Sequence, residues 1–324
     1  MTILTIDNIK NKTILISPLD WGFGHTTRCV PIIDLLLKNN NTLIFAGNTA
    51  QLTFIKIEFP HIETTHIEGY NIKLSSKKST YTQLATQSKS IIKAIKSESK
   101  WVNNYIKTKA IDLIISDHRY GFRHQNIESI FLSHQLNLYV PFFKTIVNTK
   151  LRTYINQFSS CWIYDDQKIN LAGELSHPKK IKIPYSYIGL HTRFSVKKTH
   201  KIYDYLIIIS GPSPENTYFL NTIEEKIKKS TLKISIVSTI QSVNHLKTVD
   251  YFYKPTSSKL NDLINKSNCI VSRSGYTTLM DLFLCHKKAI LVPTKGQYEQ
   301  EYLGKNVNCS FFEFVSEFKP EQDE

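Results

Sequence analysis

The most informative part of this chain is the stretch TILISPLDWGFGHTTR, residues 13–28. It begins with an apolar run, Thr13–Ser17, passes through a turn with two glycines, and continues into a segment of helical period, Thr27–Asn39. Runs that are apolar at nearly every position are typical of strands buried on both faces, as in parallel sheets. The stretch therefore predicts a strand, a tight turn and a helix, which form the first βα unit of an α/β domain.

The same alternation of strand and helix continues along the chain. Short runs rich in Ile, Leu and Val predict further strands at Thr42–Ala46, Ile111–Ser116, Ser129–Ser133, Tyr205–Ser210, Lys233–Val237, Asn268–Val271 and Ala289–Val292. Longer, more polar segments of helical period lie between them, including Tyr81–Thr108, Asn216–Lys229 and Tyr276–Cys285. This pattern predicts an α/β fold with doubly wound parallel sheets.

The length of 324 residues is sufficient for two domains, each with its own core. The polar, aperiodic stretch between Gly189 and Tyr203 is the expected junction. We therefore expect a Rossmann-like N-terminal domain over residues 1–190 and a second Rossmann-like domain over residues 191–310. Residues 311–324 are expected to form a C-terminal helix and tail that could pack back on the first domain.

The composition narrows the class of protein. Five cysteines without a Cys-x-x-Cys pair indicate reduced thiols in a cytoplasmic protein and give no zinc signature. No run approaches the roughly 18 apolar residues of a membrane span, and no signal-peptide pattern is present. The formal net charge of +14 suits an anionic ligand or an anionic membrane surface, although a Lys-rich proteome would produce the same charge. Nucleic acid is not an expected partner, because no RNA-binding aromatic pattern accompanies the charge.

Polar residues at the carboxyl ends of strands are the functional candidates, because ligands of open α/β sheets bind there. After the first strand come Gly22 and Gly24, which let the backbone approach a ligand closely, and His25, whose imidazole suits a general base. After the strand at Ile111–Ser116, Asp117 could orient that imidazole as the acid of a triad does. The alternatives are an ordinary capped turn at His25 and a helix N-cap at Asp117.

Two further strand ends carry weaker candidates. His134, Gln135 and Asn137 follow the strand at Ser129–Ser133 and are expected at the same edge of the first sheet. In the second half, Gly211-Pro212-Ser213 follows the strand at Tyr205–Ser210. The backbone amides and the Ser213 hydroxyl of this turn could hold a diphosphate. The alternative is a rigid strand–helix turn without a ligand.

The segment Ser272–Asp281 is the strongest candidate for binding phosphate. Ser274, Gly275 and Thr277 open a predicted helix with backbone amides and hydroxyl groups, an arrangement that binds anions. Asp281 lies roughly 10 Å further along this helix, at about 1.5 Å per residue. This distance suits a carboxylate that accepts hydrogen bonds from ribose hydroxyls while phosphates lie at the helix tip. The polar loop Pro293–Glu301 could then reach a sugar.

These motifs resemble, in the same order along the chain, those of GT-B glycosyltransferases of family 28. That group includes the lipid-linked N-acetylglucosaminyltransferase of peptidoglycan synthesis. Gly22–His25 corresponds to its glycine-rich turn with His, and His134, Gln135 and Asn137 are similar to a polar stretch on its acceptor side. The resemblance implies two Rossmann-like domains that face each other across a cleft, with the acceptor in the first and a nucleotide-sugar donor in the second.

The resemblance also implies a set of donor-binding residues in the second half. Arg193 lies at the offset from Gly189 at which the group has an Arg. Arg273-Ser274-Gly275 together with Asp281 is similar to its phosphate- and ribose-binding segment, with Asp in place of Glu. Of the group's Gln pair on the sugar, this chain keeps only Gln300.

A second group resembles the first motif even more closely. UDP-sugar hydrolases of the pseudaminic-acid pathway share the GT-B architecture and carry Gly-x-Gly-His-x-x-Arg, a pattern that Gly22 to Arg28 satisfies in full. The resemblances imply a glycosyltransferase that moves a hexose-type sugar from a UDP-linked donor to an acceptor hydroxyl, with His25 as base and without a metal or other cofactor. The alternatives are a nucleotide-sugar hydrolase that uses water and a nucleotide-sugar-binding protein without catalysis.

The acceptor itself is not identified by the sequence. A lipid-linked acceptor would place the enzyme in the cytoplasm at the inner face of the membrane. Phe142-Phe143 with Lys144 and Lys150, and the basic amphipathic stretch Lys77–Lys109, could contact an anionic membrane there. For both segments the alternative is ordinary packing against the core.

Overall fold

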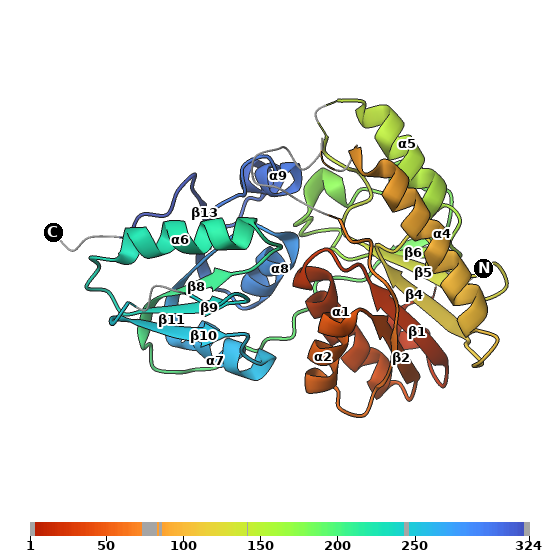
Figure 1. The fold of residues 1–324 in the computed structure, drawn as a ribbon, viewed down its shortest axis with the longest axis horizontal. Helices are drawn as coiled ribbons and strands as arrows, with labels where there is room; N and C mark the ends of the chain where they lie inside the picture. The colour runs from red at the N-terminus through yellow and green to blue at the C-terminus, as the bar shows by residue number, and fades with distance from the viewer. Residues whose placement is uncertain (1–3, 73–82, 84–85, 141, 243–245, 321–324) are drawn as a thin grey trace. The chain divides into compact units, whose positions relative to one another are not determined.

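The protein, seen in a computed structural model, divides by its internal contacts into two compact units. The structure describes residues 4–72, 83, 86–140, 142–242 and 246–320. The first unit holds the described residues up to 72 and from 86 to 191, and the second holds Gln83 and the described residues from Thr192 onward. Each unit is built around its own parallel sheet with helices packed on it (Figure 1).

Among the described residues, seven parallel strands form the first sheet, in the order β3-β2-β1-β4-β5-β6-β7. Chain order reverses between β1 and β4, and ligands of doubly wound sheets bind at such a switch point. The strands are β1 Thr13–Pro18, β2 Thr42–Gly47, β3 Glu63–His66, β4 Leu113–Asp117, β5 Glu128–Ser133, β6 Ser160–Ile163 and β7 Tyr185–Tyr187.

Helix α1 (Phe23–Lys38) begins before the predicted start at Thr27. Gly22 is its N-cap and has a φ of 79°, in the left-handed region that a residue with a side chain rarely adopts. Because the helix begins this early, His25 lies in its first turn, where backbone N–H groups have no partner within the helix. The unit also contains α2 (Thr49–Glu58), α4 (Ser88–Tyr105) and α5 (Lys144–Ile155).

Helix α4 packs its apolar side on the core of the first unit. Val102 is fully buried, and the partly buried Trp101 and Tyr105 pack on the same cluster as Leu15 and Ile44. The basic stretch Lys77–Lys109, which contains this helix, was expected either to contact an anionic membrane or to pack against the core. For residues 88–105 the structure supports packing on the core; residues 77–82 lie outside the described part of the chain.

The second sheet, in the described part of the chain, has six parallel strands in the order β10-β9-β8-β11-β12-β13. This is the same reversing order as in the first sheet, here with the switch between β8 and β11. The strands are β8 Tyr203–Ile209, β9 Ile234–Ser238, β10 Val249–Tyr253, β11 Ser267–Ser272, β12 Lys288–Leu291 and β13 Phe312–Phe314. The prediction of two Rossmann-like parallel-sheet domains is confirmed.

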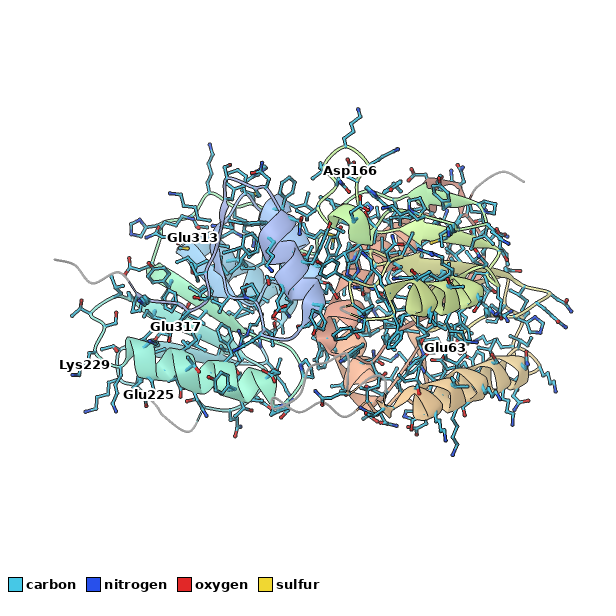
Figure 2. The ribbon with its side chains drawn as sticks, turned by 90° about the horizontal axis from the view of Figure 1, so that it is seen from above. Glu63, Asp166, Glu225, Lys229, Glu313 and Glu317 are labelled. Carbon is cyan, nitrogen blue, oxygen red and sulfur yellow. The ribbon has the colours of Figure 1, made fainter. Side chains whose placement is uncertain are left out.

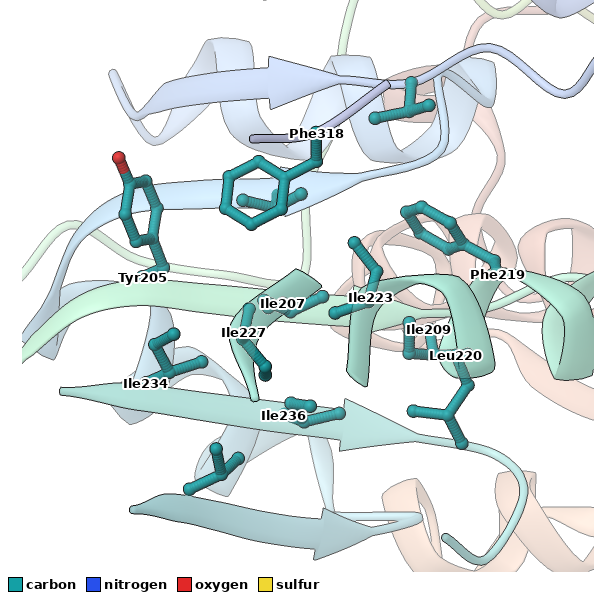
Figure 3. Packing of buried hydrophobic residues seen from close by; sticks show 13 residues of the cluster. Tyr205, Ile207, Ile209, Phe219, Leu220, Ile223, Ile227, Ile234, Ile236 and Phe318 are labelled. Carbon is teal, nitrogen blue, oxygen red and sulfur yellow. The ribbon is translucent and has the colours of Figure 1, made fainter. Parts of the chain in front are cut away.

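Four described helices pack on this sheet: α6 (Glu215–Ile227), α7 (Ser257–Lys266), α8 (Tyr276–Leu284) and α9 (Tyr298–Asn306). The helical period sorts the residues of α6, because positions three or four apart share a face. Phe219, Ile223 and Ile227 point into the core against the strands (Figure 3). Glu225, on the other face, is exposed and points outward (Figure 2).

The strands that the sequence did not predict lie at or next to sheet edges. They are β3, β6, β7, β10 and β13. The four edge strands β3, β7, β10 and β13 are partly exposed and therefore lack an unbroken apolar run, whereas β6, next to an edge, is buried but only four residues long. The C-terminal segment also differs from its predicted structure. Residues 312–314 form β13 instead of a helix, and Phe318 lies in the core of the second unit.

Candidate functional site

His25 stands at the switch point of the first sheet, in the first turn of α1. Its side chain keeps 15% of its surface exposed, so a ligand can reach the imidazole. Ring Nδ1 points toward the end of β4, where it lies 3.1 Å from Asp117 Oδ1. The two residues predicted to form a pair are therefore adjacent in the structure.

Asp117 is held at this point by the register of the two central strands. Pro18 of β1 pairs with Asp117 of β4, and the N–H of Leu19 donates to the Asp117 carbonyl oxygen at 2.8 Å. The carboxylate is fully buried. A buried carboxylate is stable only when hydrogen-bond donors satisfy its oxygens. The donors that contact Asp117 therefore determine its orientation and its protonation state.

Arg28 is the main partner of this carboxylate. Its Nε donates to Asp117 Oδ2 at 2.7 Å, and its Nη2 donates to Oδ1. Nη2 also lies 2.7 Å from His25 Nδ1, and Nη1 lies 2.6 Å from His134 Nδ1. The sequence analysis used Arg28 only as part of a motif. Its spacing of three residues from His25, which places both on one helix face, is the signal that points to this contact.

The charges in this group set the protonation states. Burial lowers the pKa of His25, and Arg28 lowers it further against the opposing effect of Asp117. Burial acts to raise the pKa of Asp117, but Arg28 and His25 together hold it well below its usual range. At neutral pH we therefore expect a neutral imidazole and an ionised carboxylate. A general base and its orienting acid need these states.

Two more imidazoles stand beside His25. His118 follows β4 with a left-handed φ of 60°, and its Nε2 lies 2.6 Å from Ser133 Oγ. Its ring meets that of His25 edge to face at 5.0 Å and lies 5.7 Å from that of His134. Burial places the pKa of His118 well below its usual value. No role was predicted for His118, although its position directly after a strand end could have suggested one.

The acceptor-side candidates differ in how their side chains are used. His134 contacts Arg28, and Gln135 is half-buried. Asn137 is buried, and its amide donates to the carbonyl oxygens of Glu174 and His177 at 2.9 and 2.6 Å. The amide of Asn137 therefore holds the loop that follows β6.

That loop contributes to an open pocket of about 570 Å³ beside β7 in the first unit. Its lining includes His177, Lys179, Tyr185 and Tyr187. Lys179 pairs with Glu174, which offsets its positive charge, and His177 Nδ1 lies 3.1 Å from the same carboxylate. The pocket thus offers aromatic rings and hydrogen-bonding groups with little net charge.

In the second unit, α8 begins directly after β11, at the switch point of the second sheet. Gly275 is the N-cap, and no side chain caps the helix. Apart from Gly275 itself, its chain neighbours and its own helix, no atom of the described residues lies within 4 Å of the position that a Cβ of Gly275 would occupy. Thr277 stands half-buried in the first turn. Ser274, by contrast, is fully buried, and its hydroxyl donates to the carbonyl oxygen of Gln300 at 3.2 Å.

Asp281 is buried further along α8. Thr192 Oγ1 donates to its Oδ1 at 2.6 Å. Burial raises the pKa of Asp281 to about 6, although Arg193 and Thr192 act in the opposite direction. The guanidinium of Arg193 lies 4.6 Å from the ring centre of Phe194. The structure therefore brings Arg193 and Asp281 into one charged group. It adds Thr192, which the sequence analysis missed although it directly precedes Arg193.

Arg273 and Gln300 hold the chain after β12 in this structure. Arg273 Nη1 donates to the carbonyl oxygens of Val292 and Pro293 at 3.2 and 3.3 Å, and the guanidinium lies 4.0 Å over the ring of Phe219. Burial lowers the pKa of Arg273 to about 10. Gln300 belongs to α9, and its Oε1 accepts a hydrogen bond of 2.8 Å from the backbone after β12.

The turn after β8 contains the last candidate, Ser213, which is exposed. Gly211 opens this turn with a φ of 97°, and no atom lies within 4 Å of the position of a Cβ there. In the described part of the chain, no cluster of three His, Cys, Asp or Glu side chains could hold a metal ion. Across the same residues, we find no helix with the length and apolar character of a membrane span.

Comparison with known proteins gives a family match and a fold match. Residues 205–311 match the glycosyltransferase family 28 C-terminal domain. UGT73P12 of Glycyrrhiza uralensis, solved with glycyrrhetinic acid 3-O-monoglucuronide, matches with a TM-score of 0.62 and 11% identity over 97% of this chain and 84% of that one. The glycosyltransferase of kitacinnamycin gives 0.61 and 11% over 95% and 87%. MurG of Acinetobacter baumannii gives 0.51 and 10% over 94% and 86%. No curated protein matches this chain.

The protein is a glycosyltransferase with the two-domain GT-B fold. Its second unit contains a C-terminal domain of the family 28 type, which confirms the resemblance inferred from the motifs. Because the identities are only 10–11%, these solved structures establish the fold alone.

Proposed function

We propose that this enzyme transfers a hexose-type sugar from a nucleotide diphosphate-sugar donor to an acceptor hydroxyl. We propose UDP as the nucleotide of the donor and His25 as the general base. The oxygen of the acceptor forms a bond to the anomeric carbon, and its proton passes to His25 Nε2. The bond from the anomeric carbon to the diphosphate oxygen breaks, and its electron pair leaves with the diphosphate. The observation that carries this proposal is the contact between the accessible His25 and the buried, ionised Asp117 at the switch point.

The donor is proposed to bind the second unit at the start of α8. The backbone amides at the start of α8, after Gly275, and the hydroxyl of Thr277 would hold the diphosphate, because helix N-termini favour anions. Asp281 would accept hydrogen bonds from the ribose. Arg193, beside it, adds a positive charge that stabilises the leaving diphosphate without a metal ion.

We propose roles around the donor site for the remaining predicted donor-binding residues. Ser274 and Gln300 join the start of α8 to α9, and Arg273 fixes the chain after β12. Ser213, in the open turn after β8, remains available to a phosphate oxygen. Gly22 and Gly24, in the turn before His25, would let the backbone approach the donor closely, since glycine has no side chain. Metal independence is part of the proposal and needs its own test with a chelator.

The acceptor is proposed to bind the first unit near His134, Gln135 and Asn137. The neighbouring pocket with Tyr185 and Tyr187 suits a sugar or another ring with hydroxyl groups, because aromatic side chains offer both an apolar face and a polar tip. Hydrolysis by water remains the second candidate. The complete motif from Gly22 to Arg28 favours it, since Arg28 is engaged with the base and its acid.

We further propose peripheral contact with an anionic membrane. Phe142, Phe143 and Ile146, at the start of α5, are 68%, 71% and 66% exposed. Lys144 and Lys150 flank them on the same helix. Exposed aromatic and aliphatic side chains beside lysines are typical of surfaces that lie on anionic lipid. A cytoplasmic enzyme with a lipid-linked acceptor would use such a surface.

Incubation with a panel of UDP-, GDP-, CMP- and dTDP-sugars tests the reaction. Nucleotide release is followed with and without a bacterial lipid extract, and with and without EDTA. Release that depends on the extract and resists EDTA supports the transferase, and rapid release without any acceptor supports the hydrolase. Absence of nucleotide binding in calorimetry would remove both.

A further inference from the structure

A buried cation lies at the centre of the His25–Asp117 group. Arg28 is 2% exposed and donates to both oxygens of Asp117. The same guanidinium contacts the Nδ1 atoms of His25 and His134. Besides satisfying the buried carboxylate, Arg28 thus contacts two imidazoles that could take up a proton.

The chemistry of the guanidinium limits what this contact can be. Arginine donates hydrogen bonds and cannot accept them, so a hydrogen bond from Arg28 to His25 requires a lone pair on Nδ1. A hydrogen bond from His25 to Asp117 requires a proton on Nδ1 instead. The two arrangements exclude each other, and only the second leaves the lone pair on Nε2 that a base needs.

The first arrangement requires a neutral imidazole, and the charge of Arg28 disfavours an imidazolium in the second. An imidazolium would place a second positive charge 2.7 Å from Arg28 Nη2, next to a carboxylate that Arg28 already neutralises. We propose that Arg28 is a positioning residue for the His25 base: it fixes Asp117, and its charge beside Nδ1 keeps the imidazole uncharged and able to accept a proton in mildly acidic solution. This inference rests on the proposed role of His25 as base.

The groups that face His25 from the neighbouring elements agree with this role. Asp117 at the end of β4 is the one described anion among them, and it is paired with Arg28. His118, after β4, and His134, after β5, are the other titratable groups. Burial is the largest cause of the lowered pKa of His25, and the charge of Arg28 is the next. Removal of that charge would leave Asp117 as the dominant partner.

Titration of His25 by NMR in the free, full-length protein is the test. In Arg28→Met, the unpaired carboxylate next to Nδ1 is expected to raise the pKa of His25 by about one unit or more. Arg28→Lys keeps the charge and is expected to stay closer to the wild type. The His25→Ala spectrum assigns the resonance, and Arg123→Met controls for the loss of a positive charge elsewhere in the unit.

A second pair of variants covers a failure of Arg28→Met to fold, since an unpaired buried carboxylate is costly. Asp117→Asn leaves the cation alone beside His25, and Asp117→Asn with Arg28→Met removes both charges. The pKa of His25 is expected to be higher in the double variant than in Asp117→Asn. The acid limb of the pH–rate profile should move in the same direction as these titrations.

An unchanged pKa of His25 in Arg28→Met would overturn the inference. So would a rise in the donor KM of Arg28→Lys with an unchanged pH profile, because Arg28 would then bind the donor. The NMR titration uses no substrate, so it separates the two ideas. Failure of sugar transfer with a shifted titration would refute the proposed reaction and leave the effect of Arg28 standing.

Discussion

The backbone N–H of Leu19 donates to the carbonyl oxygen of Asp117 at 2.8 Å and thereby joins the ends of β1 and β4. This bond continues the parallel ladder by one step beyond β1. It places the turn that leads to His25 next to the carboxylate of Asp117. The candidate base and its acid, far apart in sequence, therefore depend on strand register for their contact.

His25→Ala is expected to reduce sugar transfer by about 10²–10⁴-fold, the range that a general base contributes. The affinity for the nucleotide should not change, because the donor is proposed to bind the second unit. Steady-state rates and calorimetry measure the two quantities. His61→Ala, which removes an exposed histidine of the same unit, is the matched control. Wild-type turnover in His25→Ala would exclude the assigned base.

Asp281→Asn is expected to weaken donor binding by about tenfold, since hydrogen bonds to a charged acceptor contribute about 1.5–3 kcal/mol. The pKa of Asp281 is about 6, so its protonated fraction grows as pH falls through 6. Donor affinity of the wild type should therefore decrease below pH 6, and that of the variant should be flat there. Calorimetry from pH 5 to 8 measures both.

The matched control is Asp262→Asn, an exposed aspartate of α7 in the same unit.

Folding stability distinguishes lost binding from lost structure. Because the folded pKa of Asp281 lies above its usual value, ionisation of this group opposes folding as pH rises through 6. The Asn variant should therefore unfold no more easily than wild type at pH 8. Equal donor affinity of Asp281→Asn and the wild type would disprove the ribose contact.

Asp165→Ala is expected to destabilise the first unit by about 3 kcal/mol, because it leaves several buried donors without an acceptor. The fully buried carboxylate accepts from the backbone N–H groups of Leu171 and Ala172, both at 3.0 Å, and from Ser176 Oγ at 2.8 Å. Urea unfolding measures the loss. Asp34→Ala, which breaks only an exposed pair, should cost at most about 1 kcal/mol. Equal stability of the two variants would contradict this structural role.

Phe142→Ser with Phe143→Ser is expected to lower partition onto anionic vesicles by at least about tenfold, because each buried aromatic side chain contributes about 1.5–3 kcal/mol. Sedimentation with phosphatidylglycerol vesicles measures it, and vesicles of phosphatidylcholine alone show whether the lysines take part. Tyr218→Ser with Tyr253→Ser removes two exposed aromatics of the second unit as control. Vesicle binding that both double variants retain would argue against a membrane surface at α5.

Much of the fold could be predicted because buried parallel strands are apolar at nearly every position. The central strands β1, β4, β8 and β11 carry this signal and were found within two residues of their ends. Edge strands such as β3 and β7 lack this signal and were not predicted, since one side of each faces solvent and their residues are polar. Helix α1 began earlier than expected because its start depends on the backbone angle of Gly22.

The sequence by itself indicated the central strands and most of the helices, and it singled out His25, Asp117 and Asp281 as candidate site residues. It could do so because burial on both faces and helical period leave marks in every short window of the chain. Only the tertiary structure decided which of these side chains meet. The contact of Arg28 with Asp117 and that of Thr192 with Asp281 join distant segments. Such contacts depend on strand register and on the packing of distant segments, which leave no local pattern in the sequence.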